Sequence, residues 1–377
     1  MAENRQQRPV MITAGGTGGH VYPGLAVARA LMAQGIPVVW MGTRKGLEAR
    51  VIPEAGIEMA WLDVNGLRGK GWQTVLMAPV NLVRALVQSV GIMLKHKPAA
   101  ILGMGGFVAG PGGLVAALMG KPVVIHEQNA VAGLTNTLLS KVCRRVLEGF
   151  PGTFASSAKV MATGNPVRLD IASLPAPLER LADRDDQPVQ ILVVGGSLGA
   201  QALNKAVPQA LALLDTASRP VVRHQAGVRN IEEARSHYAN AGVDGEVTPF
   251  IEDMAEAYAW ADLVICRSGA LTIAELAVVG VAAILIPFPH AVDDHQTANA
   301  RYLADNGAAL LVQQSDLTAE KLAGILKDLC SDRTKLRQMG VASRQLAKPY
   351  ATTQVAAIVA AYAGYDFDNK TNTAGKQ

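Results

Sequence analysis

The chain has 377 residues, of which 50% are hydrophobic and 18% are charged, and its formal net charge is +4. This length suffices for two domains with separate cores, and the hydrophobic content excludes a disordered chain. The small positive charge suits anionic ligands or an anionic membrane surface and does not indicate nucleic-acid binding.

Strand-like apolar runs alternate with helix-length patterns along the whole sequence. This alternation predicts an α/β protein with parallel sheets covered by helices on both faces. The predicted strands are 9–14, 37–42, 57–62, 99–103, 122–126, 144–148, 189–194, 220–224, 245–249, 262–266, 282–286 and 308–312. The predicted helices include 20–34, 107–118, 200–214, 270–279, 294–305, 316–346 and 351–364.

Two glycine-rich turns of similar sequence lie 180 residues apart: residues 15–20 (GGTGGH) and 195–200 (GGSLGA). Each follows an apolar strand and opens a helix, an arrangement that can hold an anion at the helix N-terminus. The repeat predicts two nucleotide-binding-type halves with a cleft between them. The first turn fits neither the dinucleotide fingerprint nor the P-loop, which disfavours an NAD enzyme or a P-loop NTPase.

His20 stands where the first turn enters its helix. The positive helix end disfavours the imidazolium, so the ring stays neutral, as a general base requires. A histidine that only packs against the turn is the alternative interpretation.

Two further loops follow neighbouring predicted strands. Residues 103–113 form a further glycine-rich turn, and residues 126–129 (HEQN) place four polar side chains at a strand end. Carboxyl ends of parallel strands are where ligands bind, so both loops are candidate site segments. Glu127 could orient His20 or bind an acceptor hydroxyl, and Asn129 could bind a hydroxyl or amide. Close helix packing and an ordinary solvated loop are the respective alternatives.

The second half carries its own candidate site. Ser197 offers a hydroxyl beside the backbone donors of the second glycine turn. Residues 267–275 (RSGALTIAE) follow a strand and start a helix whose N-terminal donors suit a phosphate. Glu275 is placed to take both hydroxyls of a ribose, and the polar segment 287–299 follows the next strand. An aspartate at 293 or 294 that only caps the next helix is the alternative for that segment.

Several other segments organise the chain. The proline-rich and charged stretch 164–188 is predicted to be an exposed interdomain linker. Pro349 predicts a break between the last two helical patterns. Cys143, Cys266 and Cys330 lack CxxC spacing, so reduced cytoplasmic thiols are expected. The longest uncharged apolar stretch, 276–289, is too short to span a bilayer, so a soluble or peripheral protein is expected.

Taken in order, the motifs GGTGGH, GMGGFVAGPGG, HEQN, GNPVR, GGSLGA, RSGALTIAE and DDHQTANA resemble those of one family. This is the family of bacterial UDP-N-acetylglucosamine transferases that act on undecaprenyl-pyrophosphoryl-muramyl-pentapeptide, within glycosyltransferase family 28. The resemblance covers roughly residues 9–350. It implies the glycosyltransferase B fold, with two Rossmann-like domains and parallel sheets facing across a cleft.

The resemblance also implies a division of labour between domains. Residues 1–168 would form the acceptor- and membrane-binding domain, with the final helix 350–365 packing back on it. Residues 169–349 would bind UDP-GlcNAc, and residues 366–377 would be a disordered tail. Leu198 departs from the family, where glutamine is usual, and leaves one contact near the phosphates in doubt.

By the same resemblance, His20 and Glu127 are the catalytic candidates, and Gly105 and Gly106 belong to an acceptor loop. The uracil pocket would be formed by Phe250 and Ile251. The full set implied for donor binding is Thr17, Gly18, Gly19, Asn129, Arg168, Ser197, Ile251, Ala270, Leu271, Thr272, Ile273, Ala274, Glu275 and Gln296.

The implied reaction is an inverting transfer of GlcNAc to the C4 hydroxyl of MurNAc, without a metal or other cofactor. The expected partners are the lipid-linked acceptor, the cytoplasmic face of the bacterial inner membrane, and other cell-wall and division proteins, with no nucleic acid. The segment from Leu67 to Leu86, with Trp72 beside basic residues, is a candidate interfacial region or a buried amphipathic helix. The alternative functions are a UDP-GlcNAc 2-epimerase and a non-catalytic UDP-sugar-binding regulator.

Overall fold

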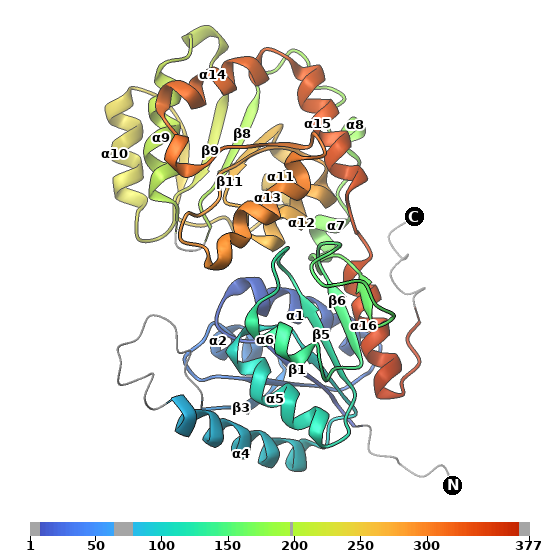
Figure 1. Cartoon of the computed structure of the whole chain (residues 1–377). Coiled ribbons are helices and arrows are strands. Elements are labelled where there is room, and N and C mark those ends of the chain that lie inside the picture. Colours follow the sequence, from blue (N-terminus) through green and yellow to red (C-terminus); the bar gives the residue numbers. More distant parts are fainter. Residues whose placement is uncertain (1–7, 64–77, 197–198, 369–377) are drawn as a thin grey trace. The chain divides into compact units, whose positions relative to one another are not determined.

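The chain forms two compact units, shown in the computed structural model of Figure 1. Unit 1 comprises Met1–Arg168 and Tyr350–Gln377, and unit 2 comprises Leu169–Pro349. The structure describes residues 8–63, 78–196 and 199–368. Ser197, Leu198, the part of the predicted interfacial segment before residue 78, and most of the predicted polar tail lie outside the described residues.

Unit 1 is built on a seven-stranded parallel sheet in the order β3-β2-β1-β4-β5-β6-β7. Consecutive strands run outward in both directions from the β1–β4 pair, which is the switch point where ligands bind in such sheets. Six of the seven strands are as predicted. The short edge strand β7 was not predicted, because its three residues are too few for a pattern. The strands are β1 Val10–Thr13, β2 Val38–Gly42, β3 Glu58–Trp61, β4 Ala100–Gly103, β5 Val123–Glu127, β6 Arg145–Glu148 and β7 Val160–Ala162.

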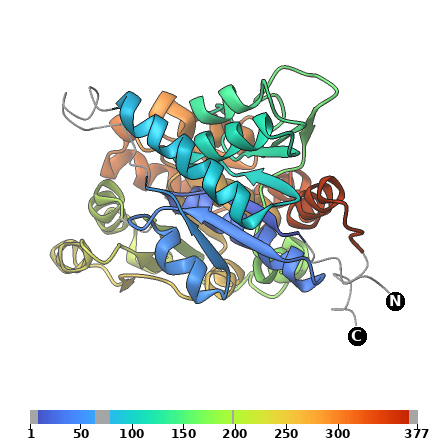
Figure 2. The ribbon, with the colours of Figure 1, turned by 90° about the horizontal axis from the view of Figure 1, so that it is seen from below.

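Helices cover both faces of this sheet, because the strand residues that point to either face are apolar. Val10 and Ile12 join the core beneath α1 and α16, whereas Met11 between them joins the core beneath α4 and α5. Figure 2 shows α4 lying along α5. The helices of unit 1 are α1 Gly18–Ala33, α2 Glu48–Glu54, α4 Ala78–His96, α5 Gly106–Leu118, α6 Leu134–Leu139 and α16 Ala351–Ala363.

The last helix, α16, packs against α1 in unit 1. Val355 and Val359 are fully buried in the core that also contains Val21. The hydroxyl of Thr352 donates to the carbonyl of Val167 over 2.9 Å. The break predicted at Pro349 is confirmed, since one helix ends at residue 345 and α16 begins at residue 351.

Unit 2 repeats the architecture with a six-stranded parallel sheet in the order β10-β9-β8-β11-β12-β13. All six strands are as predicted, and β8 and β11 form the switch point. The strands are β8 Gln190–Val194, β9 Val221–Gln225, β10 Glu246–Thr248, β11 Leu263–Cys266, β12 Ala282–Leu285 and β13 Ala309–Leu311. The helices are α7 Leu169–Ala172, α8 Pro177–Arg180, α9 Gln201–Ala212, α10 Ile231–Ala241, α11 Met254–Trp260, α12 Ala270–Val279, α13 His295–Ala304, α14 Ala319–Cys330 and α15 Arg333–Gln345.

The structure corrects two expectations in unit 2. The pattern at 316–346 is not one helix, because it divides into α14 and α15. The side chain of Asp332 caps α15 by accepting from the N–H of Lys335 over 2.9 Å. The stretch 164–188 is not an exposed linker throughout. Arg180 donates to the carbonyl of Ala261 over 2.8 Å, and Arg184 pairs with buried Asp262 over 3.2 Å. The charge density of the stretch suggested solvent exposure, but its arginines satisfy buried acceptors of unit 2.

Candidate active site

The first glycine turn joins β1 to α1 at the switch point of the unit 1 sheet. Gly16 has a φ of +95°, which L side chains rarely adopt, so glycine is needed there. The helix begins after Thr17, whose carbonyl accepts from the N–H groups of His20 and Val21. Within the described residues, the N–H groups of Gly18 and Gly19 make no hydrogen bond, as expected for the first turn of a helix. These free donors can face a ligand.

A buried carboxylate closes the other side of this turn. Glu48, which is fully buried at the start of α2, accepts from the N–H of Gly16 over 3.1 Å. Its other oxygen accepts from the N–H and the hydroxyl of Thr43 over 3.0 and 2.7 Å. A Cβ on Gly15 would lie 2.6 Å from this second oxygen. Glu48 was not predicted as a site residue, because nothing near it in the sequence links it to the turn.

The ring of His20 lies against the glycine-rich turn of residues 103–113, between β4 and α5. A Cβ on Gly105 would lie 3.2 Å from Cε1 of His20, and one on Gly106 would lie 2.8 Å from the carbonyl oxygen of Gly15. Both glycines have positive φ, +91° and +76°. The turns at residues 15–20 and 103–113 therefore pack directly on each other, at the sheet edge where both were predicted to contribute to a site.

The hydrogen-bond partner of His20 is Gln128, in the HEQN segment after β5. Nδ1 of His20 lies 2.8 Å from Oε1 of Gln128. Nε2 of Gln128 lies 3.1 Å from Nδ1 of His126, whose Nε2 lies 2.9 Å from the carbonyl of Gly164. Burial lowers the pKa of His126 to about 4, so this ring is neutral at pH 7. The four groups form one continuous chain that ends at His20.

Glu127 forms hydrogen bonds within its own loop. The expectation that it orients His20 is therefore wrong. Its two carboxylate oxygens accept from the N–H groups of Asn129 and Gly133, each over 3.1 Å. They also accept from the side-chain amides of Asn129 and Asn136, over 3.3 and 2.9 Å. Among the described residues, Glu127 makes no hydrogen bond to His20. Its neighbour Gln128 occupies that position because alternate residues of the strand end point to opposite faces.

In unit 2 the second glycine turn follows β8 at the equivalent place. The side chain of Gln225, at the end of β9, accepts from the N–H of Gly196 and donates to its carbonyl, each over 3.0 Å. Gly199 has a φ of +75°, and a Cβ there would collide with the carbonyl of Ala226. Gln225 thus fixes the conformation of the turn at Gly196. Gly199 cannot be replaced by a residue with a side chain. Ser197, the predicted diphosphate ligand, lies outside the described residues.

The start of α12 lies at the adjacent strand end of the same sheet. Gln296 connects the loops after β11 and β12, because its Oε1 accepts from the N–H of Ser268 over 3.2 Å and of Phe288 over 2.9 Å. Within the described residues, its side-chain NH₂ group makes no hydrogen bond. Glu275, one turn into α12 and partly exposed, accepts from the hydroxyl of Tyr258 over 3.0 Å. The position of Glu275 leaves it accessible to a ligand.

The other predicted donor residues of unit 2 lie near this edge. Ala270, Leu271, Thr272, Ile273 and Ala274 form the first turn of α12, and Ile251 is partly exposed after β10. In unit 1, Thr17 and Gly19 are exposed, and Gly18, Asn129 and Arg168 are partly exposed. Among the described residues, no cluster of three or more His, Cys, Asp or Glu side chains could hold a metal ion.

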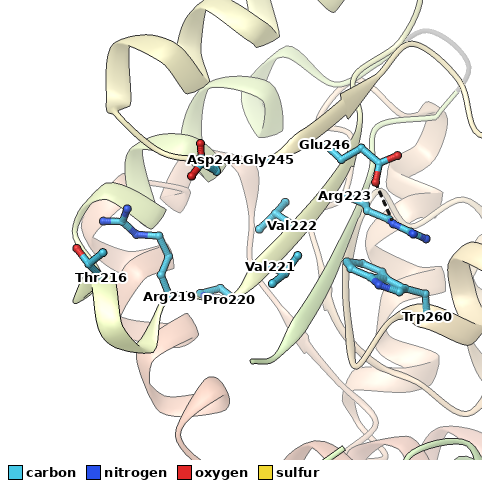
Figure 3. Close-up of a pocket in the computed structure, with 10 residues that line it drawn as sticks. All are labelled: Thr216, Arg219, Pro220, Val221, Val222, Arg223, Asp244, Gly245, Glu246 and Trp260. Atoms are coloured by element: carbon cyan, nitrogen blue, oxygen red, sulfur yellow. Dashed lines mark ion pairs between the residues drawn. The ribbon is translucent and has the colours of Figure 1, made fainter. Parts of the chain in front are cut away.

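A hollow of about 640 Å³ lies elsewhere in unit 2, at the amino ends of β9 and β10 (Figure 3). Arg223 lies over the ring of Trp260 at 4.4 Å and pairs with Glu246 over 3.1 Å. None of the predicted site residues lines this hollow, which is at the opposite edge of the sheet from the glycine turn. Its lining residues are Thr216, Arg219, Pro220, Val221, Val222, Arg223, Asp244, Gly245, Glu246 and Trp260.

Solved structures with the same fold include several glycosyltransferases. A crystal structure of Acinetobacter baumannii MurG matches with 45% identity and a TM-score of 0.82, covering 93% of this chain and 99% of that one. CalG4, the calicheamicin glycosyltransferase, matches at 16% identity with a TM-score of 0.64 over 95% of this chain and 99% of that one. A UDP-GlcNAc 2-epimerase from Neisseria meningitidis matches at 13% identity with a TM-score of 0.63 over 92% and 97%. The last two likenesses concern the fold alone. The fold and its paired glycine turns define a glycosyltransferase of the B type, as predicted.

Sequence relatives define the family more closely. The N-terminal domain profile of glycosyltransferase family 28 matches residues 10–148, and the C-terminal domain profile matches residues 190–355. A Cupriavidus metallidurans UDP-N-acetylglucosamine--N-acetylmuramyl-(pentapeptide) pyrophosphoryl-undecaprenol N-acetylglucosamine transferase is 55% identical, covering 95% of this chain and 99% of the relative. The Alkalilimnicola ehrlichii protein of the same name is 56% identical over 93% and 98%. The chain belongs to glycosyltransferase family 28, and the predicted family is confirmed.

Proposed function

We propose that this enzyme transfers N-acetylglucosamine from UDP-N-acetylglucosamine to the C4 hydroxyl of MurNAc in undecaprenyl-pyrophosphoryl-MurNAc-pentapeptide. The near-full-length identity to transferases of that name supports this substrate pair. The observation that carries the chemistry is the state of His20. Its Nδ1 is hydrogen-bonded to Gln128, its ring lies against the turn that contains Gly105 and Gly106, and its Nε2 makes no hydrogen bond within the described residues.

The reaction is a single displacement with inversion. The acceptor's C4 oxygen attacks the anomeric carbon, the bond from that carbon to the diphosphate oxygen breaks, and its electron pair stays with UDP. The hydroxyl proton passes to Nε2 of His20, which acts as the general base. An α-linked donor sugar thereby gives a β-1,4 linkage. Glu127 contributes by ordering the loop that carries Asn129.

Unit 2 is proposed to bind the donor. The N–H groups of Gly195, Gly196 and Gly199 are hydrogen-bonded within unit 2, so the donors proposed for the departing diphosphate are the N–H groups in the first turns of α9 and α12. This mechanism uses no metal. Glu275 holds the ribose hydroxyls, and the free amide of Gln296 contacts phosphate or sugar. The remaining proposed donor contacts are Thr17, Gly18, Gly19, Asn129, Arg168, Ser197, Ile251, Ala270, Leu271, Thr272, Ile273 and Ala274.

Release of UDP tests the proposal directly. The full chain is incubated with UDP-GlcNAc in the presence and absence of a lipid-linked MurNAc-pentapeptide acceptor, and UDP and the disaccharide product are quantified. The expected result is UDP release that requires the acceptor and equals product formation. Conversion of UDP-GlcNAc without acceptor would instead identify an epimerase, and binding without turnover would identify a regulator.

A lipid-linked acceptor requires contact with a membrane surface, and α4 offers an apolar face for it. Val83, Val87, Val90 and Leu94 follow one another at helical spacing and are exposed, with Val87 at 66%. The buried residues of α4 lie on the other side of the helix. Leu118, at the end of neighbouring α5, is 79% exposed. Within the described residues, no helix has the length and apolarity needed to cross a bilayer.

We therefore propose peripheral attachment through α4 to the anionic cytoplasmic face of the inner membrane. Basic residues in and before α4, including Arg68, Lys70 and Arg84, would add attraction to anionic lipids. Vesicle flotation with and without anionic lipid tests this. Charge reversal at Arg68 and Lys70, and separately Val83→Ser with Val87→Ser, should each reduce flotation. Vesicle binding that neither pair of changes affects would contradict the proposal.

A further inference from the structure

The chain of hydrogen bonds behind His20 begins at a group whose role is chemically fixed. The carbonyl of Gly164 can only accept, so Nε2 of His126, 2.9 Å away, must carry a hydrogen. His126 is fully buried and its pKa is lowered to about 4, so it holds only one ring proton at pH 7. Nδ1 of His126 therefore carries no hydrogen, and its lone pair accepts a hydrogen bond from a donor.

Gln128 supplies that donor, and this sets the direction of its side-chain amide. Its Nε2 lies 3.1 Å from Nδ1 of His126 and 3.2 Å from the carbonyl of His126, and both of these groups are acceptors. An amide oxygen in this position would face two acceptors, so the NH₂ group must point here. The backbone of Gln128 is also fixed, since its carbonyl accepts from the side chain of Asn165 over 3.0 Å. Gln128 is 1% exposed, so water does not offer its amide another orientation.

With the NH₂ group committed to His126, Oε1 of Gln128 faces Nδ1 of His20 at 2.8 Å. This oxygen can only accept, so Nδ1 of His20 must carry the hydrogen. The second nitrogen of the neutral ring, Nε2, then carries no hydrogen and has a lone pair that can accept a proton. A Cβ on Gly105 or Gly106 would lie 3.2 or 3.6 Å from a ring carbon of His20, so the two glycines leave the ring room to lie in this position.

We propose that Gln128, oriented by His126, is a positioning residue that holds His20 as its Nδ1–H tautomer and so presents Nε2 as the proton acceptor. The inference rests on the proposed function for the role of His20, but the tautomer is a property of the protein alone. When Nε2 takes the proton, the Nδ1–H···Oε1 bond remains, so no rearrangement of Gln128 is needed. A base histidine in the wrong tautomer loses up to about 10⁴-fold in kcat.

The tautomer is measured by long-range ¹H–¹⁵N correlation spectra of the full chain labelled with ¹⁵N-histidine. The signals of His20 are assigned by their loss in His20→Asn. At a pH where the ring is neutral, wild-type His20 should show a protonated Nδ1 and an unprotonated Nε2. A wild-type spectrum with the proton on Nε2 overturns the inference, whatever the variants do.

Two variants of Gln128 separate hydrogen bonding from packing. Gln128→Met keeps the size and removes the acceptor, so the Nε2–H tautomer should appear and kcat should fall at least tenfold, with the KM for UDP-GlcNAc changing less than twofold. Gln128→Glu keeps an acceptor for His20 and should retain the Nδ1–H tautomer, although its second oxygen faces the two acceptors of His126 and should lower stability. Gln354→Met, at an exposed position on α16, is the matched control and should change neither spectrum nor rate.

The outcomes distinguish this inference from the proposed function. If the wild-type tautomer is Nδ1–H and acceptor-dependent UDP release is absent, the function fails and the tautomer assignment stands. If UDP release occurs and Gln128→Met leaves the His20 tautomer unchanged, the function stands and the positioning role is wrong. Should Gln128→Met not fold, the wild-type spectrum and Gln128→Glu still decide.

Discussion

The backbone N–H of Gly16 donates a hydrogen bond to Oε2 of Glu48 over 3.1 Å. A carboxylate of the chain itself thus occupies a donor that a phosphate would use in such a turn. In the second turn the N–H of Gly196 meets the neutral amide oxygen of Gln225 over 3.0 Å. The two turns share a positive φ at this glycine, +95° and +82°, but differ in charge. The N–H is occupied in both turns, but only the first turn carries a buried carboxylate, which would repel a diphosphate. This difference in charge supports the proposal that the diphosphate binds beside the Gly195–Gly199 turn.

Glu48→Gln should destabilise unit 1 by about 1–3 kcal/mol, because a carboxamide leaves one buried donor unpaired. If its oxygen faces Thr43, its NH₂ group meets the N–H of Gly16. Urea unfolding measures the loss, and kcat should fall with it because the turn leads into His20. Glu54→Gln, at an exposed position on the same helix, is the control and should change the unfolding free energy by less than about 0.5 kcal/mol. Equal stability of the two variants would contradict the role of Glu48.

Much of the fold follows from the sequence because both sheets consist of buried parallel strands. Runs such as 190–194 (QILVV) are apolar on both faces and end in glycine turns, so their positions and order are readable. Edge strand β7 has no such signal. Arg180 and Arg184 could not be placed, because their respective partners, the carbonyl of Ala261 and the side chain of Asp262, are more than 70 residues away in the sequence.

The candidate site could be located from the sequence but not its hydrogen bonding. The turns and the HEQN segment follow strands that meet at one sheet edge, which identifies the region. Which of Glu127 and Gln128 reaches His20 depends on the twist and exact end of β5, and adjacent residues there point to opposite faces. Glu48 and Gln225 likewise act through contacts that only the assembled sheet creates.

His20→Ala should lower kcat about 10²–10⁴-fold, because the acceptor hydroxyl loses its general base. The affinity for UDP-GlcNAc, measured by calorimetry, should stay within twofold, since the proposed contact of His20 is with the acceptor. His237→Ala, on α10 of unit 2, is the control for a histidine outside the site. Near-wild-type turnover of His20→Ala with normal donor binding would show that the base assignment is wrong.

Glu275→Gln should raise the KM for UDP-GlcNAc about 10–100-fold, because a carboxamide cannot accept from both ribose hydroxyls and a hydrogen bond to a charged group is lost. Tyr258 can still donate to the remaining oxygen, so the thermal stability of unit 2 should change little. Donor-saturation kinetics at fixed acceptor measure the effect. Glu179→Gln, at an exposed position on α8, should leave KM unchanged. An effect of Glu275→Gln on kcat alone would contradict ribose binding.

Gly106→Ala should reduce kcat more than its effect on stability explains. Gly106 has a φ of +76°, and its Cβ would lie 2.8 Å from the carbonyl oxygen of Gly15, so the first turn must move. Gly120→Ala is a close control, because Gly120 has a φ of +71° and its Cβ would contact nothing within 4 Å. Both changes should cost about 1–2 kcal/mol of backbone strain in urea unfolding. Only Gly106→Ala should also lower UDP release, and equal rates for the two variants would contradict packing of the turns as a requirement.

Acid should destabilise unit 2 through His224. The side chain is fully buried, its Nδ1 lies 3.0 Å from the hydroxyl of Tyr238, and its Nε2 lies 3.0 Å from Oδ1 of Asn204. Burial lowers its pKa from 6.5 to about 3. Between these values the unfolded chain binds a proton that the native ring does not, so unfolding becomes more favourable as the pH falls.

The stabilising effect of neutral His224 is therefore fully present above about pH 6.5 and is lost progressively as the pH falls towards 3. The slope in the unfolding free energy reaches about 1.4 kcal/mol per pH unit for one such group. Urea unfolding at pH 7, 6 and 5 measures it in the wild type and in His224→Gln, which should be less stable at pH 7 but should lose less stability on acidification. His126 has the same sign of shift in unit 1, so the difference between the two proteins isolates the contribution of His224. Parallel pH profiles for wild type and His224→Gln would rule out this histidine as a source of acid sensitivity.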